Sequence, residues 1–169
     1  MANNFSVSES TDVTPDWFAV AVVTAREPVE NNRWITERWR VLGVVPASAA
    51  AADERQLIRS GPEGEQYLWS GFRIQLRKSD ADAYYFNLIG QNPSLQVVCQ
   101  TLDDGELRPV LVTADYIDAM AHHEAGAEVQ AAAIPPEVYV WLERHVLEHY
   151  SPEEKQPRRK HDDGIKDAG

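Results

Sequence analysis

The sequence predicts an α+β domain in which a mainly antiparallel curved sheet, or partial barrel, of about six strands precedes two C-terminal helices. Apolar and polar residues alternate in short runs over the first two thirds of the chain, whereas helix-capping signals appear in the last third. The length supports a single folded unit, because 169 residues correspond to about one typical domain.

Short runs that alternate or are rich in β-branched residues, each bounded by turn-forming residues, predict the strands. The segments are 17–26, 37–45, 72–77, 84–89, 96–102 and 106–113. Pro46 ends the second segment, because proline has no N–H to donate to a ladder. The clearest hairpin signal is Asp103-Asp104-Gly105, which separates the last two segments. Short connections of this kind predict antiparallel neighbours, whereas residues 46–65 predict little beyond a loop over 61–64.

Two helices are expected after the strands. Asp115 is a suitable N-cap for a helix over 116–125, and the glycine that follows can adopt the left-handed conformation of a helix end. Pro136 opens the second helix, because a proline in the first turn removes no helical hydrogen bond. This helix is expected to run to about Tyr150 and to bury Leu142 in its apolar arc.

Charge and aromatic content separate a body from two tails. Nearly all aromatic residues lie within 17–150, which is the expected single α+β domain. Residues 1–16 and 151–169 contain almost no large apolar side chains, so burial cannot offset the entropy lost on ordering them. We therefore expect two disordered tails, of which the second carries many charges of both signs.

Composition excludes several classes of function. The net charge of -11 argues against nucleic acid and against an anionic membrane as partners, since both favour basic surfaces. No apolar run approaches the roughly 20 residues of a membrane-spanning helix, and the polar N-terminus does not resemble a secretory signal. The lone Cys99 predicts a reducing, cytoplasmic location and is expected to be a core residue within its strand.

No standard catalytic motif is present, so the sequence predicts no catalytic residue and no cofactor. The segment 145–149 matches the H-x-x-E-H pattern, in which His145 and His149 lie on one helical face and could share a zinc ion. A third protein ligand is not identifiable, and the alternative is a buried His149 with His145 near the helix end. His145 and His149 are thus the candidate ligands for a metal that is not expected.

Basic and aromatic residues concentrate in the segment 32–40 of an otherwise acidic body. Trp34 is expected in or beside a loop, preceded by Arg33 and followed by Arg38. An exposed tryptophan beside arginine is typical of protein-binding hot spots, so these three residues are the predicted partner-binding site. The alternative is a structural Arg–Trp stack that closes the end of the sheet.

Seven short stretches form a distinctive combination across residues 17–150. They are Asn32-Arg33-Trp34, Glu37-Arg38-Trp39, Val41 to Pro46, Tyr84 to Leu88, Arg108 to Thr113, Pro135-Pro136-Glu137 and Glu148-His149-Tyr150. Together they resemble the bacterial domain-of-unknown-function family numbered thirty-three oh five. Members of that family tend to be encoded beside molybdenum-dependent formate dehydrogenase genes. The resemblance implies a role in maturation, assembly or regulation of such an enzyme, and it supplies no catalytic residue.

The expected function is that of a non-enzymatic, cytoplasmic accessory or adaptor protein that contacts another protein. The resemblance implies a formate dehydrogenase subunit or maturation factor as the partner. The alternative is a small-ligand or metal-binding domain that uses the face of the sheet or the pair His145 and His149. An enzyme of unrecognised chemistry is a third class.

Overall fold

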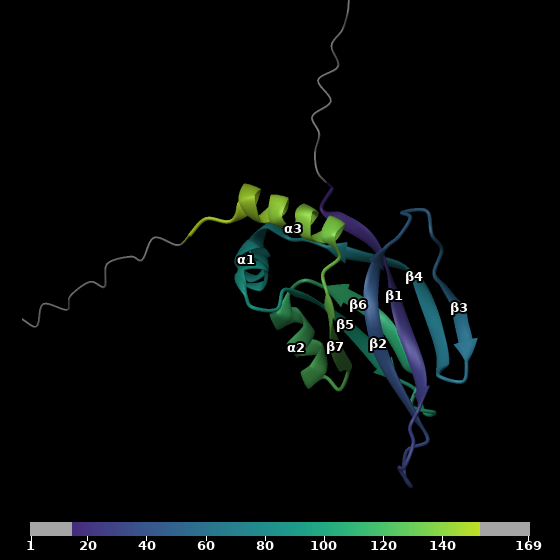
Figure 1. The fold of residues 1–169 in the computed structure, drawn as a ribbon. Helices are drawn as coiled ribbons and strands as arrows, with labels where there is room; N and C mark the ends of the chain where they lie inside the picture. Colours follow the sequence, from purple (N-terminus) through teal and green to yellow (C-terminus); the bar gives the residue numbers. More distant parts are fainter. Residues whose placement is uncertain (1–14, 153–169) are drawn as a thin grey trace, which may run out of the picture.

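The computed structural model describes residues 15–152, which form two antiparallel sheets with helices gathered along one side (Figure 1). The first sheet has the strand order β2-β1-β4-β3, with β1 at Trp17–Pro28, β2 at Glu37–Pro46, β3 at Glu54–Gly61 and β4 at Gly64–Gln75. The second has the order β6-β5-β7, with β5 at Ser94–Thr101, β6 at Leu107–Thr113 and β7 at Glu128–Ala133. The helices are α1 at Ala81–Ile89, after a 3-10 turn at Lys78–Asp80, α2 at Tyr116–Glu124 and α3 at Pro136–His149.

One hydrophobic core joins the two sheets and α3. Val20 and Val22 of β1 and Val97 of β5 are fully buried in it. Leu142 of α3 is also fully buried, as the sequence predicted. Burial of one such side chain typically stabilises a fold by about 1.5–3 kcal/mol, so this core holds both sheets and the last helix together.

The sheets contact each other where β2 lies beside β7 and where β4 lies beside β6. The backbone N–H of Val41 in β2 donates to Oε1 of Gln130 in β7 at 2.7 Å. At this junction a side-chain acceptor thus takes the place of the backbone carbonyl that a neighbouring strand would supply. The strand β3 lies at a free edge of the first sheet, and all eight of its residues are exposed. Because β3 stays at a free edge of the first sheet, the fold is not a closed barrel.

Because of a β-bulge, the side chains of β2 that face the core differ from those predicted by simple alternation. Val22 pairs with Val44 while Thr24 pairs with Val41, so one extra residue of β2 is accommodated between them. Val41 and Val44 are consequently both buried, whereas Val45 is 40% exposed. Alternation had grouped Val41 with Val45, and a bulge reverses this grouping because it shifts the following side chains to the other face.

The strand predicted over 84–89 was wrong, because these residues belong to α1. Ala81 and Tyr84 are buried one helical turn apart, and the Tyr84 hydroxyl accepts a hydrogen bond from the backbone N–H of Arg77 at 3.1 Å. A short apolar run with aromatic residues fits a strand or a buried helical turn equally well by its pattern alone. The tertiary contacts of Tyr84 decide in favour of the helix.

Two further strands were not predicted. β3 has no buried residue, and β7 ends in three alanines, so neither carries the pattern of a half-buried strand. The α+β class is confirmed, but residues 15–152 form seven strands in two sheets and three α-helices, in place of about six strands followed by two helices. The predicted loop at 61–64 is confirmed as the tight connection between β3 and β4.

Pro15 and Asp16, the last two residues of the predicted N-terminal tail, form hydrogen bonds with the body. The indole N–H of Trp141 donates to the carbonyl oxygen of Pro15 at 2.9 Å, and the backbone N–H of Leu76 donates to that of Asp16 at 2.7 Å. Residues 1–14 and 153–169, which make up most of the two predicted tails, lie outside the described residues. Between residues 15 and 152, none of the helices combines the length and apolarity needed to cross a bilayer.

Candidate functional site

The predicted partner-binding residues lie at the tip of the β1–β2 hairpin, which projects beyond the rest of the body (Figure 1). The backbone N–H of Val29 donates to the carbonyl of Thr36 at 3.0 Å and closes the base of this tip. Asn31 adopts a left-handed conformation, with φ of 63°. The Asn32 side chain accepts a hydrogen bond from the backbone N–H of Trp34 at 2.9 Å. Local turn bonds thus shape the loop that presents Trp34.

Trp34 is 91% exposed, and its neighbour Ile35 is 51% exposed. The Trp34 ring therefore does not close the end of the sheet, which was the structural alternative for this residue. Arg33 and Arg38 are also exposed. Within residues 15–152, no carboxylate forms an ion pair with either of them. The structure places Arg33 and Trp34 in the projecting loop, together with the exposed carboxylate of Glu30, and places Arg38 just beyond the loop, as the second residue of β2.

Other arginines near the hairpin are already paired. Arg40 binds Glu27 with an Nη2 to Oε1 distance of 2.8 Å, and the hydrogen bond from Arg40 lowers the pKa of the Glu27 carboxyl. Arg26 contacts Glu37 and Glu65, each at 2.9 Å. These exposed pairs contribute little to stability individually. Among residues 15–152, Arg33, Arg38 and the exposed Glu30 of this hairpin form no ion pair, which leaves two positive charges and one negative charge available to a partner.

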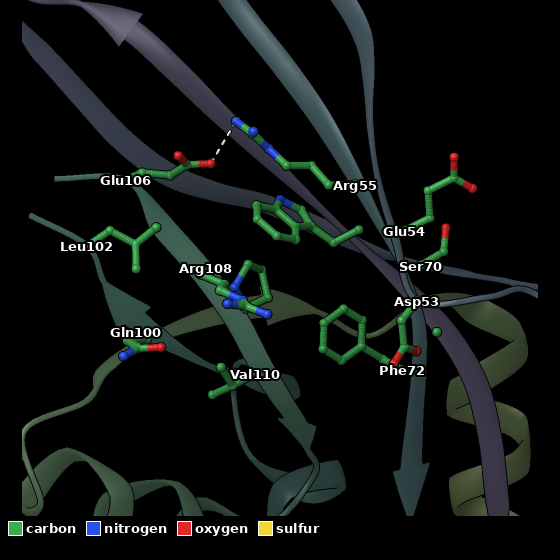
Figure 2. A pocket seen from close by; sticks show the side chains of 13 residues that line it. Asp53, Glu54, Arg55, Ser70, Phe72, Gln100, Leu102, Glu106, Arg108 and Val110 are labelled. Carbon is green, nitrogen blue, oxygen red and sulfur yellow. Dashed lines mark ion pairs between the residues drawn. The ribbon is translucent and has the colours of Figure 1, made fainter. Parts of the chain in front are cut away.

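A cleft of about 770 Å³, which the sequence did not predict, opens between β3 and β4 on one side and β6 on the other (Figure 2). Trp69 and Phe72 form an aromatic wall, and Val110 faces them from β6. The indole N–H of Trp69 donates to the Thr24 hydroxyl at 2.9 Å, which fixes the orientation of the ring. The volume lies within the usual range of small-ligand sites.

Charged side chains of both signs surround this cleft. Arg55 bridges it by an ion pair with Glu106, with Nη2 and Oε1 separated by 2.7 Å (Figure 2). The Arg55 guanidinium also lies 4.1 Å from the centre of the Tyr67 ring, a cation–π arrangement. Arg108 lines the cleft from β6, and within residues 15–152 it forms no ion pair. Asp53 lines the other side, so the cleft offers both a cation and an anion.

The two candidate metal ligands are neighbours, but their burial is the reverse of what was predicted. His145 is 5% exposed, whereas the His149 side chain is 24% exposed. Their ring centres are 4.6 Å apart. Nε2 of His145 is buried without a hydrogen-bond partner, and burial lowers the pKa of this imidazole. In the part of the chain that the structure describes, no third histidine, cysteine or carboxylate completes a metal-binding group with them.

Cys99 is fully buried in β5, as the sequence predicted for a core residue. Burial raises the pKa of its thiol to about 12. A thiol with such a pKa stays protonated at neutral pH and is a poor nucleophile. Its surroundings therefore favour packing as the role of Cys99.

The fold and its surfaces define an α+β protein of two antiparallel sheets with a projecting cationic hairpin and an amphipathic cleft. The chain belongs to the family described as "Protein of unknown function (DUF3305)", whose model matches residues 19–160. The resemblance found in the sequence is thereby confirmed, and the match continues past Tyr150, where the body was expected to end. No curated protein and no solved structure matches the chain.

Proposed function

We propose that this protein is a non-enzymatic accessory protein that binds a partner protein through its hairpin tip. The observation that carries the proposal is Trp34, 91% exposed near Arg33 and Arg38, neither of which forms an ion pair among residues 15–152. A large aromatic ring gains free energy when a partner removes it from water, and arginine adds directed hydrogen bonds. Tryptophan and arginine are the residue types most enriched among interface hot spots.

The partner proposed first is a subunit or maturation factor of a molybdenum-dependent formate dehydrogenase, because the family resemblance implies that setting. The proposal places the protein in the cytoplasm, in keeping with its single cysteine. Arginine binds carboxylates through two parallel hydrogen bonds. The surface that receives the tip is therefore expected to be an apolar depression with acidic residues at its border.

The test is capture of purified formate dehydrogenase subunits and their maturation factor by the immobilised full chain. Trp34→Ala is expected to abolish capture and to leave the melting temperature unchanged, because the ring makes no core contact. Val140→Ala is the matched control, since Val140 is a 56% exposed residue of α3 away from the tip. Undiminished capture by the Trp34→Ala protein would refute the proposed interface.

A second candidate function is the binding of a small ligand in the cleft. Arg108, which forms no ion pair in the described part of the chain, suits the carboxylate of a ligand. Phe72 in the same cleft suits an apolar body of the ligand, and Asp53 suits an amine. Amino acids and dipeptides are therefore the probes to screen by thermal shift. Arg108→Ala should remove any stabilisation that they produce, while Arg59→Ala on the exposed β3 strand should retain it. Equal stabilisation of both variants would place the ligand elsewhere.

The metal-binding alternative is supported by one observation, the buried and unpartnered Nε2 of His145 beside the His149 ring. Elemental analysis of the purified protein tests it directly. Stoichiometric zinc that disappears when both histidines are replaced would favour this function over that of an adaptor. Protein free of bound metal after purification without chelators would argue against it.

A further inference from the structure

A groove of about 630 Å³ lies between α1 and α2, apart from both the hairpin tip and the cleft. Phe86, Tyr116 and Ile117 line it and are 63%, 61% and 74% exposed. Ile89, one turn after Phe86 on α1, is 59% exposed. Adjacent exposed side chains of this size form an apolar patch of the kind that marks an interaction surface.

The border of this α1–α2 groove is acidic. Asp115 is the only charged residue among those that line it, and its carboxylate accepts the backbone N–H of Ile117 at 2.9 Å as the cap of α2. Asp118 follows Ile117 in sequence and is exposed. Asp82 is also exposed and precedes Phe86 by one helical turn, which places both on the same side of α1. The groove therefore suits an apolar group flanked by positive charges.

The hairpin tip of this same protein has that chemistry. Trp34 and Ile35 provide exposed apolar side chains, and Arg33 and Arg38 form no ion pair among residues 15–152. Together these two arginines outweigh the single carboxylate of the exposed Glu30 in the same loop. The tip and the α1–α2 pair stand well apart in the molecule, so a tip can reach only the groove of another copy (Figure 1). We propose that the α1–α2 groove receives the hairpin tip of a second copy of this chain, with Trp34 against Phe86 and Ile117.

The shape of this contact determines the stoichiometry and the strength of the self-association. A tip meets a groove, so the two copies use different surfaces and each pair leaves one tip and one groove free. The contact area of one loop is small, so the association is weak and exchanges quickly. The inference builds on the proposed function, because the same Trp34 serves both contacts. Self-association and partner binding therefore compete for the tip, and a partner releases the protein as a monomer.

Sedimentation velocity of the full chain, from low micromolar to near millimolar concentration, tests this contact. The mean mass of the wild-type protein should rise with concentration. Ile117→Lys and Trp34→Ala should each weaken association by at least about tenfold, the effect expected from losing a hot-spot residue. Val140→Lys, an equally drastic change at an exposed site on α3, should associate like the wild type.

A charge exchange makes the test specific for tip and groove. One variant carries Arg33→Glu with Arg38→Glu, and the other carries Asp82→Lys with Asp118→Lys. Each alone should remain monomeric, because its tip and groove have the same sign of charge. A mixture should associate, since each tip then finds a groove of opposite charge. A monomeric wild type at every concentration, or a mixture that stays monomeric while the wild type associates, would overturn the inference.

The two proposals fail in different ways. Ile117→Lys removes the groove contact but keeps the tip, so capture of the formate dehydrogenase components should persist. Normal self-association without capture of any component would contradict the adaptor function and leave the tip–groove contact standing. Capture of a component by a wild-type protein that stays strictly monomeric would support the adaptor function and contradict the tip–groove contact.

Discussion

The side-chain amide of Asn87 and the main chain of Ser94 exchange two hydrogen bonds. Nδ2 of Asn87 donates to the Ser94 carbonyl at 2.8 Å, and the Ser94 N–H donates to Oδ1 of Asn87 at 3.0 Å. The same Nδ2 also donates to the carbonyl of Ala114 at 3.2 Å. One side chain on α1 thus anchors the start of β5 and the segment before α2, and so holds the two sides of the α1–α2 groove together.

Asn87→Ala should destabilise the protein by about 1–3 kcal/mol for each backbone group that is left buried and unpaired. Asn87→Asp is expected to be at least as harmful, because it removes the donor and sets a carboxylate against two carbonyl oxygens. Chemical denaturation measures both effects. Gln91→Ala, at an exposed position in the connection between α1 and β5, serves as the control and should change stability little. An unchanged free energy of unfolding in Asn87→Ala would mean that water replaces the hydrogen bonds of the amide.

Leu142→Ala should cost about 2–5 kcal/mol, because the side chain is fully buried in the core. Leu147→Ala on the same helix is a matched control, since Leu147 is 78% exposed. Both changes remove the same atoms from α3, and their difference in unfolding free energy isolates the effect of burial. Similar small losses in both variants would show that α3 contributes little to the core.

His145 should make the stability of the metal-free protein depend on pH. Burial lowers the pKa of the folded-state imidazole below its ordinary value of 6.5. The unfolded chain therefore binds the proton more readily, so stability is complete above about pH 6.5 and is lost as the pH falls through the lowered value. Unfolding measured with a chelator between about pH 7.5 and about pH 5 should show this loss.

His145→Gln should reduce the pH-dependent loss, whereas His149→Gln, at the more exposed ring, should largely preserve it. Other groups contribute to the pKa of His145, and His145→Gln leaves them in place, whereas His149→Gln removes one minor contribution. A backbone group of Arg77 and the charges of Asp16 and Glu148 raise that pKa, the charge of His149 lowers it, and the Tyr84 ring packs against His145 at 5.6 Å. An unchanged pH dependence in His145→Gln would assign the effect to another residue.

Gly71→Ala should destabilise the wall of the cleft. Gly71 has φ of 93°, and a Cβ there would overlap the carboxylate of Asp53 and lie 2.9 Å from its Cα. The left-handed backbone alone costs a residue with a Cβ about 1–2 kcal/mol. Gly43→Ala in β2 is the control, because its Cβ would meet open space and its φ is ordinary. Thermal unfolding should separate the two variants, and equal melting temperatures would contradict this account.

Local patterns predicted the elements whose residues contact the core in a regular way. The valine-rich β1 and the capped α2 were predicted in essentially their observed positions, and the Asp115 cap forms as expected. β3 and α1 were missed for opposite reasons. Every residue of β3 is exposed, so no apolar periodicity marks it, whereas the aromatic run of α1 is compatible with either period.

Candidate-site residues that are close in sequence could be predicted, whereas those that only the packing of distant segments brings together could not. Arg33, Trp34 and Arg38 are close in sequence, and a single hairpin is enough to bring them together. The cleft combines residues around position 54, residues around 70 and residues around 108, so only the packing of β6 beside β4 could reveal it. The burial of His145 could not be predicted, because it depends on Tyr84 of α1, a segment that was expected to be a strand.

The exposed edge at β3 has a consequence for solubility. A sheet edge with unpaired backbone groups can recruit further strands and nucleate aggregates. The register of β3 shifts between Leu57 and Arg59, and this irregularity interrupts the continuous ladder that an incoming strand would need. Arg55 and Arg59 add charge at the same edge. The irregular register and these charges disfavour the addition of a further strand, even though Leu57 and Ile58 are exposed at this edge.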